Sequence, residues 1–143
     1  MKIVLDTNTV VSGLLWRGPS RRLFDVEKAG RVTMCTSPLL LEELATTLGY
    51  KRLADKVTLP VAHIVQRYRE RCIVLPDIIL PGKIFDDPND NIVLGCALAH
   101  SARYVVTGDA HVLAVREFVG VALVTARQFL KEVMGERDEP EKG

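Results

Sequence analysis

Acidic residues follow two of the short apolar runs in this sequence. Asp6 comes directly after Ile3-Val4-Leu5, and Asp109 ends the stretch Val105-Val106-Thr107-Gly108-Asp109. Ligands of open α/β sheets bind beyond the carboxyl ends of the strands, so these positions suit a functional site. Carboxylates held close together repel, and a bound divalent cation is the usual compensation. An aspartate at such a place is also typical of a helix cap. It is the occurrence of two that favours a metal-binding site.

A third acid, Asp90, opens an apolar helical pattern over 90–101. Its neighbours Asp87, Asn89 and Asn91 are equally suited to cap that helix, so a capping role is the alternative for Asp90. The pattern is apolar nearly all round, which predicts a deeply packed helix.

Glu43 lies inside a helical pattern over 38–48. Four leucines mark the core face of this helix: Leu40, Leu41, Leu44 and Leu48. At about 100° per residue, Glu43 falls on the flank of that face and Glu42 falls on the far side. This geometry favours Glu43 as the inward acid, although either glutamate alone is also typical of a solvated surface charge.

Strands and helices alternate in the pattern that positions these acids. Apolar runs predict strands at 3–5, 32–36, 72–75, 104–106 and 121–124, and helical patterns cover 21–29, 38–48, 60–71, 90–101 and 125–134. Ser20 and Ser37 are the predicted caps of the first two of these helices. Residues 76–89 carry three prolines, a glycine and three aspartates and are predicted to form a loop. The alternation and the continuous apolar strands predict an α/β domain with a mostly parallel sheet.

The length and composition fit one domain. The chain has 143 residues, of which 48% are hydrophobic and 26% charged, with a net charge of +1. We expect a single domain over 1–134 and a polar, disordered tail over 135–143. The three cysteines are far apart and show no zinc-ligand spacing. No signal peptide or membrane span is evident, so we expect a cytoplasmic protein without membrane contact.

Four motifs together resemble those of a known family. They are Asp6-Thr7-Asn8, the stretch from Ser37 to Leu44 with Glu43, Asp87-Pro88-Asn89-Asp90-Asn91, and Val106-Thr107-Gly108-Asp109. In this order and spacing they resemble the PIN-domain nucleases, and in particular the toxins of VapBC-type toxin–antitoxin pairs. The resemblance extends from Met1 to about Val133. It implies a three-layer α/β/α sandwich with a central, mostly parallel sheet of about five strands.

The resemblance also implies roles for individual residues. Asp6, Asp90 and Asp109 would bind metal, and Glu43 would be the fourth catalytic acid. Asn8 matches a residue that supports the first aspartate, and Thr107 matches the hydroxyl residue before the last acid. Relatives carry a further acid shortly after the TGD triplet. Here Ala110 and His111 follow instead.

The activity implied is hydrolysis of RNA phosphodiester bonds by an endoribonuclease that uses Mg²⁺ or Mn²⁺. The proposed RNA contacts are basic residues near the first strand's loop and after the 38–48 helix: Arg17, Arg21, Arg22, Lys51 and Arg52. The implied partners are an RNA substrate, a small antitoxin protein and a second copy of the chain. Apolar helices at 10–16 and 60–71 could supply the interfaces.

Two other functions remain open from the sequence. A phosphohydrolase of the haloacid dehalogenase type also starts with a strand that ends in aspartate. Its DxDx[TV] motif requires a second acid where this chain has Asn8, which counts against it. A non-catalytic module that keeps the PIN fold and binds RNA or protein is the second alternative. Four retained acids argue against it, because positive charge would serve binding better.

Overall fold

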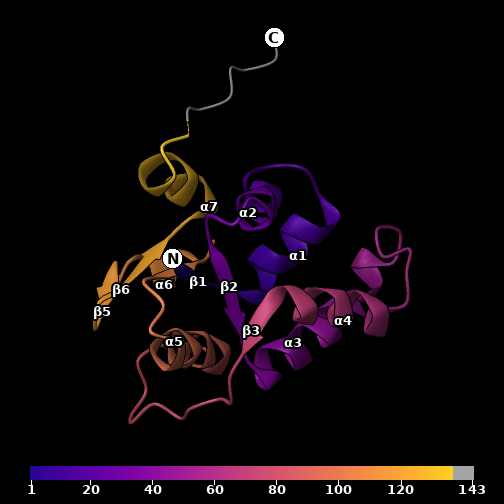
Figure 1. Cartoon of the computed structure of the whole chain (residues 1–143). Coiled ribbons are helices and arrows are strands. Elements are labelled where there is room, and N and C mark those ends of the chain that lie inside the picture. Colours follow the sequence, from indigo (N-terminus) through magenta and orange to yellow (C-terminus); the bar gives the residue numbers. More distant parts are fainter. Residues whose placement is uncertain (137–143) are drawn as a thin grey trace.

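The computed structural model describes residues 1–136 as a sheet flanked by helices (Figure 1). The strands are β1 (Lys2–Leu5), β2 (Thr33–Thr36), β3 (Cys72–Val74), β4 (Tyr104–Val106), β5 (Glu117–Phe118) and β6 (Val121–Val124). The α-helices are α1 (Thr7–Leu15), α2 (Pro19–Lys28), α3 (Pro38–Leu48), α4 (Val61–Arg71), α5 (Pro88–His100), α6 (Ala110–Leu113) and α7 (Ala126–Gln128). A short 3-10 helix, η1 (Lys51–Leu53), and a short π-helix, η2 (Phe129–Val133), are also present. Within these residues, no helix is long and apolar enough to cross a membrane.

The sheet has the strand order β3-β2-β1-β4-β6-β5. All neighbouring strands are parallel except β5 and β6. The five predicted strands are present, and the prediction of a mostly parallel α/β sheet is confirmed. Strand β5 was not predicted because two residues are too short to show a pattern. The chain moves outward from β1 to β3 and returns to β4 on the other side of β1. The strand order therefore reverses between β1 and β4, which is where α/β sheets bind ligands.

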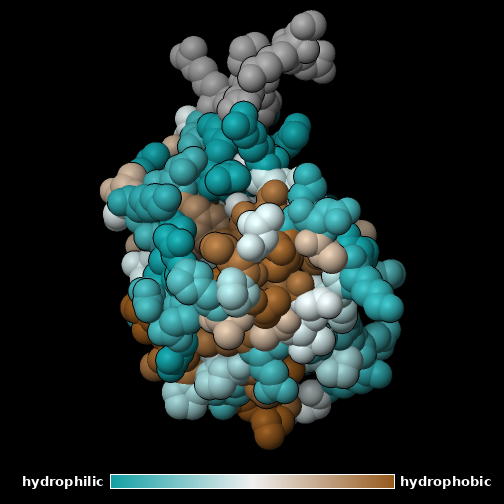
Figure 2. Space-filling model, turned by 90° about the vertical axis from the view of Figure 1, so that its right-hand side faces the viewer, coloured by the Kyte–Doolittle hydropathy of each residue, from teal (hydrophilic) through white to brown (hydrophobic). Residues whose placement is uncertain are grey.

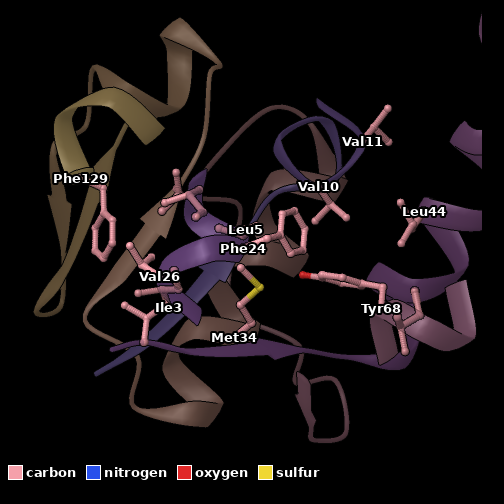
Figure 3. Packing of buried hydrophobic residues seen from close by; sticks show 14 of the residues in the cluster. Ile3, Leu5, Val10, Val11, Phe24, Val26, Met34, Leu44, Tyr68 and Phe129 are labelled. Atoms are coloured by element: carbon pink, nitrogen blue, oxygen red, sulfur yellow. The ribbon is translucent and has the colours of Figure 1, made fainter. Parts of the chain in front are cut away.

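The apolar side chains of the sheet alternate between its two faces and pack into two separate cores. Ile3 and Leu5 of β1 belong to the first core, with residues of α1, α2 and α4. Val4 belongs to the second, which is built mainly on α5. Figure 3 shows the first core, where Phe24, Met34 and Tyr68 pack together. Since successive residues of a strand point to opposite faces, helices cover both faces. The predicted three-layer sandwich is confirmed.

The starts of α3 and α2 follow local sequence signals. The Ser37 hydroxyl accepts a hydrogen bond from the backbone N–H of Leu40 at 3.4 Å, as predicted. The predicted cap at Ser20 is wrong, because Pro19 occupies the first helical position and Gly18 is the cap residue, with φ 139°. A proline is favoured there since its fixed φ suits a helix and its missing N–H costs nothing.

Two other boundaries differ from the sequence prediction. Helix α1 begins immediately after β1, whereas the sequence indicated an apolar helix only over 10–16. Helix α5 begins at Pro88, two residues before the predicted start, with Asp87 as its cap. Of the predicted tail, Gly135 and Glu136 are described, and Glu136 pairs with Arg22. Residues 137–143 lie outside the described part of the chain.

Candidate active site

Asp6 and Thr107 join the carboxyl ends of β1 and β4. The Thr107 hydroxyl donates a 2.6 Å hydrogen bond to Oδ2 of Asp6, and Oδ1 of Asp6 accepts the backbone N–H of Thr9 at 2.8 Å. Asp6 is thus the cap of α1, and one of its oxygens is tied to the neighbouring strand. Thr107 is 2% exposed, which leaves this pair little freedom to move. The arrangement fixes the first acid at the point where the strand order reverses.

Asp109 lies just beyond β4, on the same edge of the sheet. Its backbone N–H donates to the Thr107 hydroxyl at 3.1 Å, so Thr107 contacts both acids. Its Oδ1 caps the short helix α6 by accepting the N–H groups of His111 and Val112. The capping role and the position at the strand end therefore occur together. One oxygen caps the helix, and the other takes no part in it.

Asp90 lies in the first turn of α5 and lines a small pocket with Asp6, Thr107 and Phe85. Burial raises the pKa of Asp90 to about 6, and the nearby carboxylates add to this shift. Those carboxylates, in order of effect, belong to Asp87, Asp109, Asp6 and Glu43. Coulomb energy falls with distance, so mutual effects of this kind place the acids in one cluster.

Glu43 belongs to this cluster and lies on α3. Its side chain is half-buried, whereas Glu42 is exposed, in line with the inward position expected for Glu43. Burial raises the pKa of the Glu43 carboxyl, and a hydrogen bond with the Thr7 side chain lowers it. The charges of Asp87 and Asp6 raise it further. Glu43 therefore faces the start of α1 and the start of α5.

Asp87 is a fifth acid of the cluster, which the sequence indicated only as a possible cap. It does cap α5, since its Oδ1 accepts the N–H of Asn89 at 2.9 Å. Its charge is also the strongest of the acids acting on both Asp90 and Glu43. The signal that could have found it is its place in the Asp87-Pro88-Asn89-Asp90 motif, at one helical turn from Asp90.

The cluster carries unbalanced negative charge. Within residues 1–136, no basic side chain forms an ion pair with any of its five acids. In the same part of the chain, no three His, Cys, Asp or Glu side chains are already arranged to hold a metal ion. The donor set consists of carboxylate oxygens, which Mg²⁺ and Mn²⁺ prefer. Mg²⁺ keeps several waters and needs only one or two direct carboxylates, so the residues present fit such an ion.

The remaining predicted residues lie farther from the acids. Asn8 is exposed on α1, and the hydrogen bonds to the Asp6 carboxylate come from Thr9 and Thr107 instead. Helix α1 runs away from Asp6, so its nine residues separate Arg17 from Asp6 by about 13 Å at 1.5 Å each. Arg17 was expected near the mouth of the site, and it lies at the opposite end of α1.

The basic residues differ in their surroundings. Arg17, Arg21, Lys51 and Arg52 are exposed. Arg22 is partly buried and forms an ion pair with Glu136. Arg52 lies over the ring of Tyr50, at 5.6 Å from its centroid.

Comparison with known proteins identifies the family. A PIN domain family model matches residues 2–111. The chain belongs to the PIN domain family. Among solved structures, it is similar to VapBC2 from Rickettsia felis bound to a DNA fragment from their promoter. That match has 17% sequence identity and a TM-score of 0.57, and covers 86% of this chain and 97% of the other. At this identity, the likeness concerns the fold.

No match was found among curated proteins. Family membership leaves the haloacid dehalogenase alternative without support. The region that matches the PIN domain includes all five acids of the cluster, from Asp6 to Asp109.

Proposed function

We propose that this PIN domain is an endoribonuclease that uses Mg²⁺ or Mn²⁺ to hydrolyse RNA phosphodiester bonds, and that it is the toxin of a toxin–antitoxin pair. The observation that carries the proposal is the cluster of five carboxylates at the point where the strand order reverses, for which residues 1–136 provide no ion-pair partner. A binding-only module would have no use for such repulsion. A cation-dependent enzyme requires it to attract and hold its cation.

The residues of the site have different roles in this proposal. Asp6 and Asp90 line the pocket and would hold the main cation, with Asp109 contributing through water or at a second position. A divalent ion bound there supplies an activated water and neutralises charge on the phosphate. Glu43 would either ligate the cation or orient the attacking water, since it lies on α3 close enough to Asp6 and Asp87 for their charges to raise its pKa. Thr107 holds Asp6 in place.

The substrate assignment is supported by the exposed basic residues. Lys51 and Arg52 follow α3, the helix that carries Glu43. Arg17 lies between α1 and α2, and Arg21 lies in the first turn of α2. Phosphate contacts of this kind position a nucleic acid without reading its sequence. RNA bound across them would be held along its backbone while one phosphate reaches the acids.

A protein partner is supported by one face of the molecule. Seen from the side that lies to the right in Figure 1, hydrophobic residues gather in the middle of the face, inside a ring of hydrophilic ones (Figure 2). Helices α1 and α4 lie on this side, and their half-buried apolar residues include Leu14, Leu15, Ile64 and Val65. We propose that this apolar surface binds the antitoxin or a second copy of the chain. The similar Rickettsia felis structure is itself a VapBC complex.

Cleavage of labelled RNA tests the proposed activity. We expect the wild-type protein to cut RNA with Mg²⁺ or Mn²⁺ and to lose activity in EDTA. Asp6→Asn should abolish cleavage without unfolding the protein, because the amide keeps the shape of the side chain but loses its charge. Glu43→Gln should reduce cleavage strongly, whereas Glu42→Gln on the exposed side of the same helix should not.

Two outcomes would contradict the activity. One is undiminished cleavage by Asp6→Asn, which would indicate a contaminating nuclease or a different site. The other is RNA binding by the wild type with no cleavage under any metal condition, which would support the non-catalytic alternative. Co-purification with a small protein encoded beside this chain, and the effect of that protein on cleavage, would test the antitoxin assignment separately. Light scattering of the purified chain tests the homodimer.

A further inference from the structure

The segment between β3 and α5 approaches the acidic cluster at its end. It runs from residue 75 to residue 87 without regular secondary structure. Its middle rests on α5 at Gly95, where a β-carbon would lie 3.0 Å from the carbonyl oxygen of Ile78. Its last residues, 84–87, must be held in another way, because a loop lacks a ladder of backbone hydrogen bonds.

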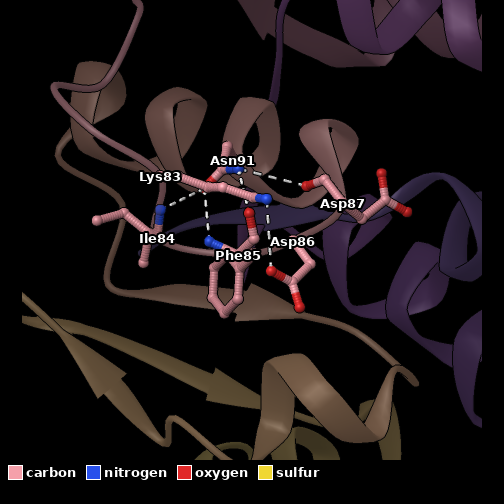
Figure 4. A network of polar contacts seen from close by, with 6 residues as sticks. All are labelled: Lys83, Ile84, Phe85, Asp86, Asp87 and Asn91. Carbon is pink, nitrogen blue, oxygen red and sulfur yellow. Dashed lines mark hydrogen bonds and ion pairs between the residues drawn. The ribbon is translucent and has the colours of Figure 1, made fainter.

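The Asn91 side chain holds these last residues (Figure 4). Its Oδ1 accepts the backbone N–H groups of Ile84 at 3.2 Å and Phe85 at 2.9 Å. Its Nδ2 donates to the carbonyl oxygens of Phe85 at 2.8 Å and Asp87 at 3.4 Å. An amide side chain offers two acceptor positions and two donor hydrogens, so this network uses all four. The other contact drawn in Figure 4 is the exposed ion pair of Lys83 with Asp86, which contributes little.

This network is directly connected to the acids. The carbonyl oxygen of Asp87 accepts both the Asn91 amide and the backbone N–H of Asp90, the latter at 3.1 Å. Phe85, which Asn91 binds twice, is 7% exposed and lines the pocket with Asp6 and Asp90. In Figure 4 the Asp87 carboxylate points away from Asn91, so the amide fixes the backbone and leaves the carboxylate available.

We propose that Asn91 is the positioning residue of the acidic site, which places Asp87, Asp90 and the pocket wall at Phe85 through the backbone of residues 84–87. It touches neither cation nor substrate, and it acts through those neighbours. This inference rests on the proposed function, because it assigns Asn91 to the site that would hold the cation. Loss of such indirect support in metal sites typically reduces metal affinity or activity by 10–100-fold.

Asn91→Ala tests this role, with Asn89→Ala as the matched control. Asn89 is the same residue type in the same helical turn, and its side chain is exposed and absent from the network. We expect Asn91→Ala to weaken Mn²⁺ binding about 10–100-fold in calorimetry and to lower kcat at saturating RNA. Hydrogen exchange of the Ile84 and Phe85 amides should accelerate in this variant. Asn89→Ala should match the wild type in all three measurements.

The outcomes separate this proposal from the proposed function. Unchanged Mn²⁺ affinity and kcat in a folded Asn91→Ala protein would overturn the positioning role. If Asn91→Ala does not fold, Asn91→Asp replaces it in the same measurements. This variant keeps the acceptor oxygen for Ile84 and Phe85 but loses the donor to Asp87, and unchanged Mn²⁺ affinity and kcat would again overturn the positioning role. If the wild type neither binds Mn²⁺ nor cuts RNA, the proposed function fails. A crystal structure of the variant then decides the proposal, since unmoved Asp87 and Asp90 carboxylates would overturn it.

Discussion

At the scale of single residues, Thr107 connects two acids of the site. Its hydroxyl donates to the Asp6 carboxylate and accepts the backbone N–H of Asp109. One oxygen atom therefore fixes the positions of the residues that follow β1 and β4 relative to each other. Thr107→Val keeps the shape but leaves both groups without this partner. We expect a loss of about 1–3 kcal/mol in the free energy of unfolding. Metal affinity should fall about 10–100-fold. Thr107→Ser, which retains the hydroxyl, should behave like the wild type, and full activity in the valine variant would contradict this role.

The raised pKa of Asp90 predicts a pH-dependent stability. Its carboxyl has a pKa of about 6 in the folded protein against an ordinary 3.8, so the native state binds more protons between these values. The protonated Asp90 carboxyl therefore contributes to the stability of the folded protein at low pH. This contribution is lost as the pH rises from about 4 to about 6 and the carboxyl becomes charged. Asp90→Asn should stabilise the metal-free protein at neutral pH. We expect only about 1 kcal/mol, because Asp90 is partly exposed and solvent screens the repulsion.

Thermal unfolding in EDTA measures this effect. At pH 7.5 the Asp90→Asn protein should melt about 3 °C higher than the wild type. Near pH 4 the difference should shrink, because the wild-type carboxyl is then already protonated in the folded state. Equal destabilisation of the variant at both pH values would show that Asp90 has a structural role and is not under repulsion.

Sequence reasoning found the acids whose positions are set by local rules. Asp6 and Asp109 were identifiable because each follows an apolar strand, and Glu43 because helical spacing places it beside the core face. Asp87 was not separable from a simple cap, since its effect on Asp90 and Glu43 depends on how α3 and α5 meet in space. The Asn91 network was not predictable either, because its partners are backbone groups of an irregular loop.

At the scale of elements, the contact between α1 and α2 depends on a glycine. A β-carbon on Gly13 would lie 2.4 Å from the Phe24 ring and 2.9 Å from the carbonyl oxygen of Ser20. Replacing glycine within a helix by alanine normally gains about 0.5–1 kcal/mol. Overpacking a core costs about 1–3 kcal/mol. Gly13→Ala should therefore destabilise the protein by about 1–2 kcal/mol in urea unfolding.

Gly49 provides the matched control for this prediction. It has a φ of −82°, and a β-carbon there would meet the Thr46 carbonyl oxygen at 3.4 Å, an ordinary contact. Gly49→Ala should be close to neutral. A Gly13→Ala protein as stable as the wild type would mean that α2 can move away from α1 at little cost.

Elements with strong local signals were predicted well. Strand β2 and helix α3 were identifiable because the apolar run, the Ser37 cap and Pro38 agree. The predicted cap of α2 was wrong, because a serine and a proline stand at adjacent positions and the proline occupies the first helical position. The prediction for α1 missed its first turn, because Thr7, Asn8 and Thr9 are poor helix formers. The Asp6 cap and the buried positions of Thr7 and Thr9 override that preference.

At the scale of the whole molecule, the fold separates two kinds of charge. Five acids gather at the carboxyl edge of the sheet, although the total charge is only +1 from 19 basic and 18 acidic residues. The acidic site by itself repels a polyanion, so the RNA binding that we propose must come from the basic residues outside it. Lys51 and Arg52 are the pair we test, because they are adjacent and exposed after α3, and Arg52 lies over the ring of Tyr50.

Removal of these two charges should affect RNA binding more than chemistry. With Lys51→Ala and Arg52→Ala combined, we expect weaker RNA binding by the Asp6→Asn protein. The slope of log affinity against log salt should also fall by about 1.4, the value for two phosphate contacts on a single strand. In the active protein, KM should rise while kcat is kept. Lys28→Ala with Arg103→Ala is the charge-matched control, because both residues are exposed, Lys28 at the end of α2 and Arg103 directly before β4. Equal losses from both pairs would mean that RNA responds to total charge alone, and the assignment of Lys51 and Arg52 would be wrong.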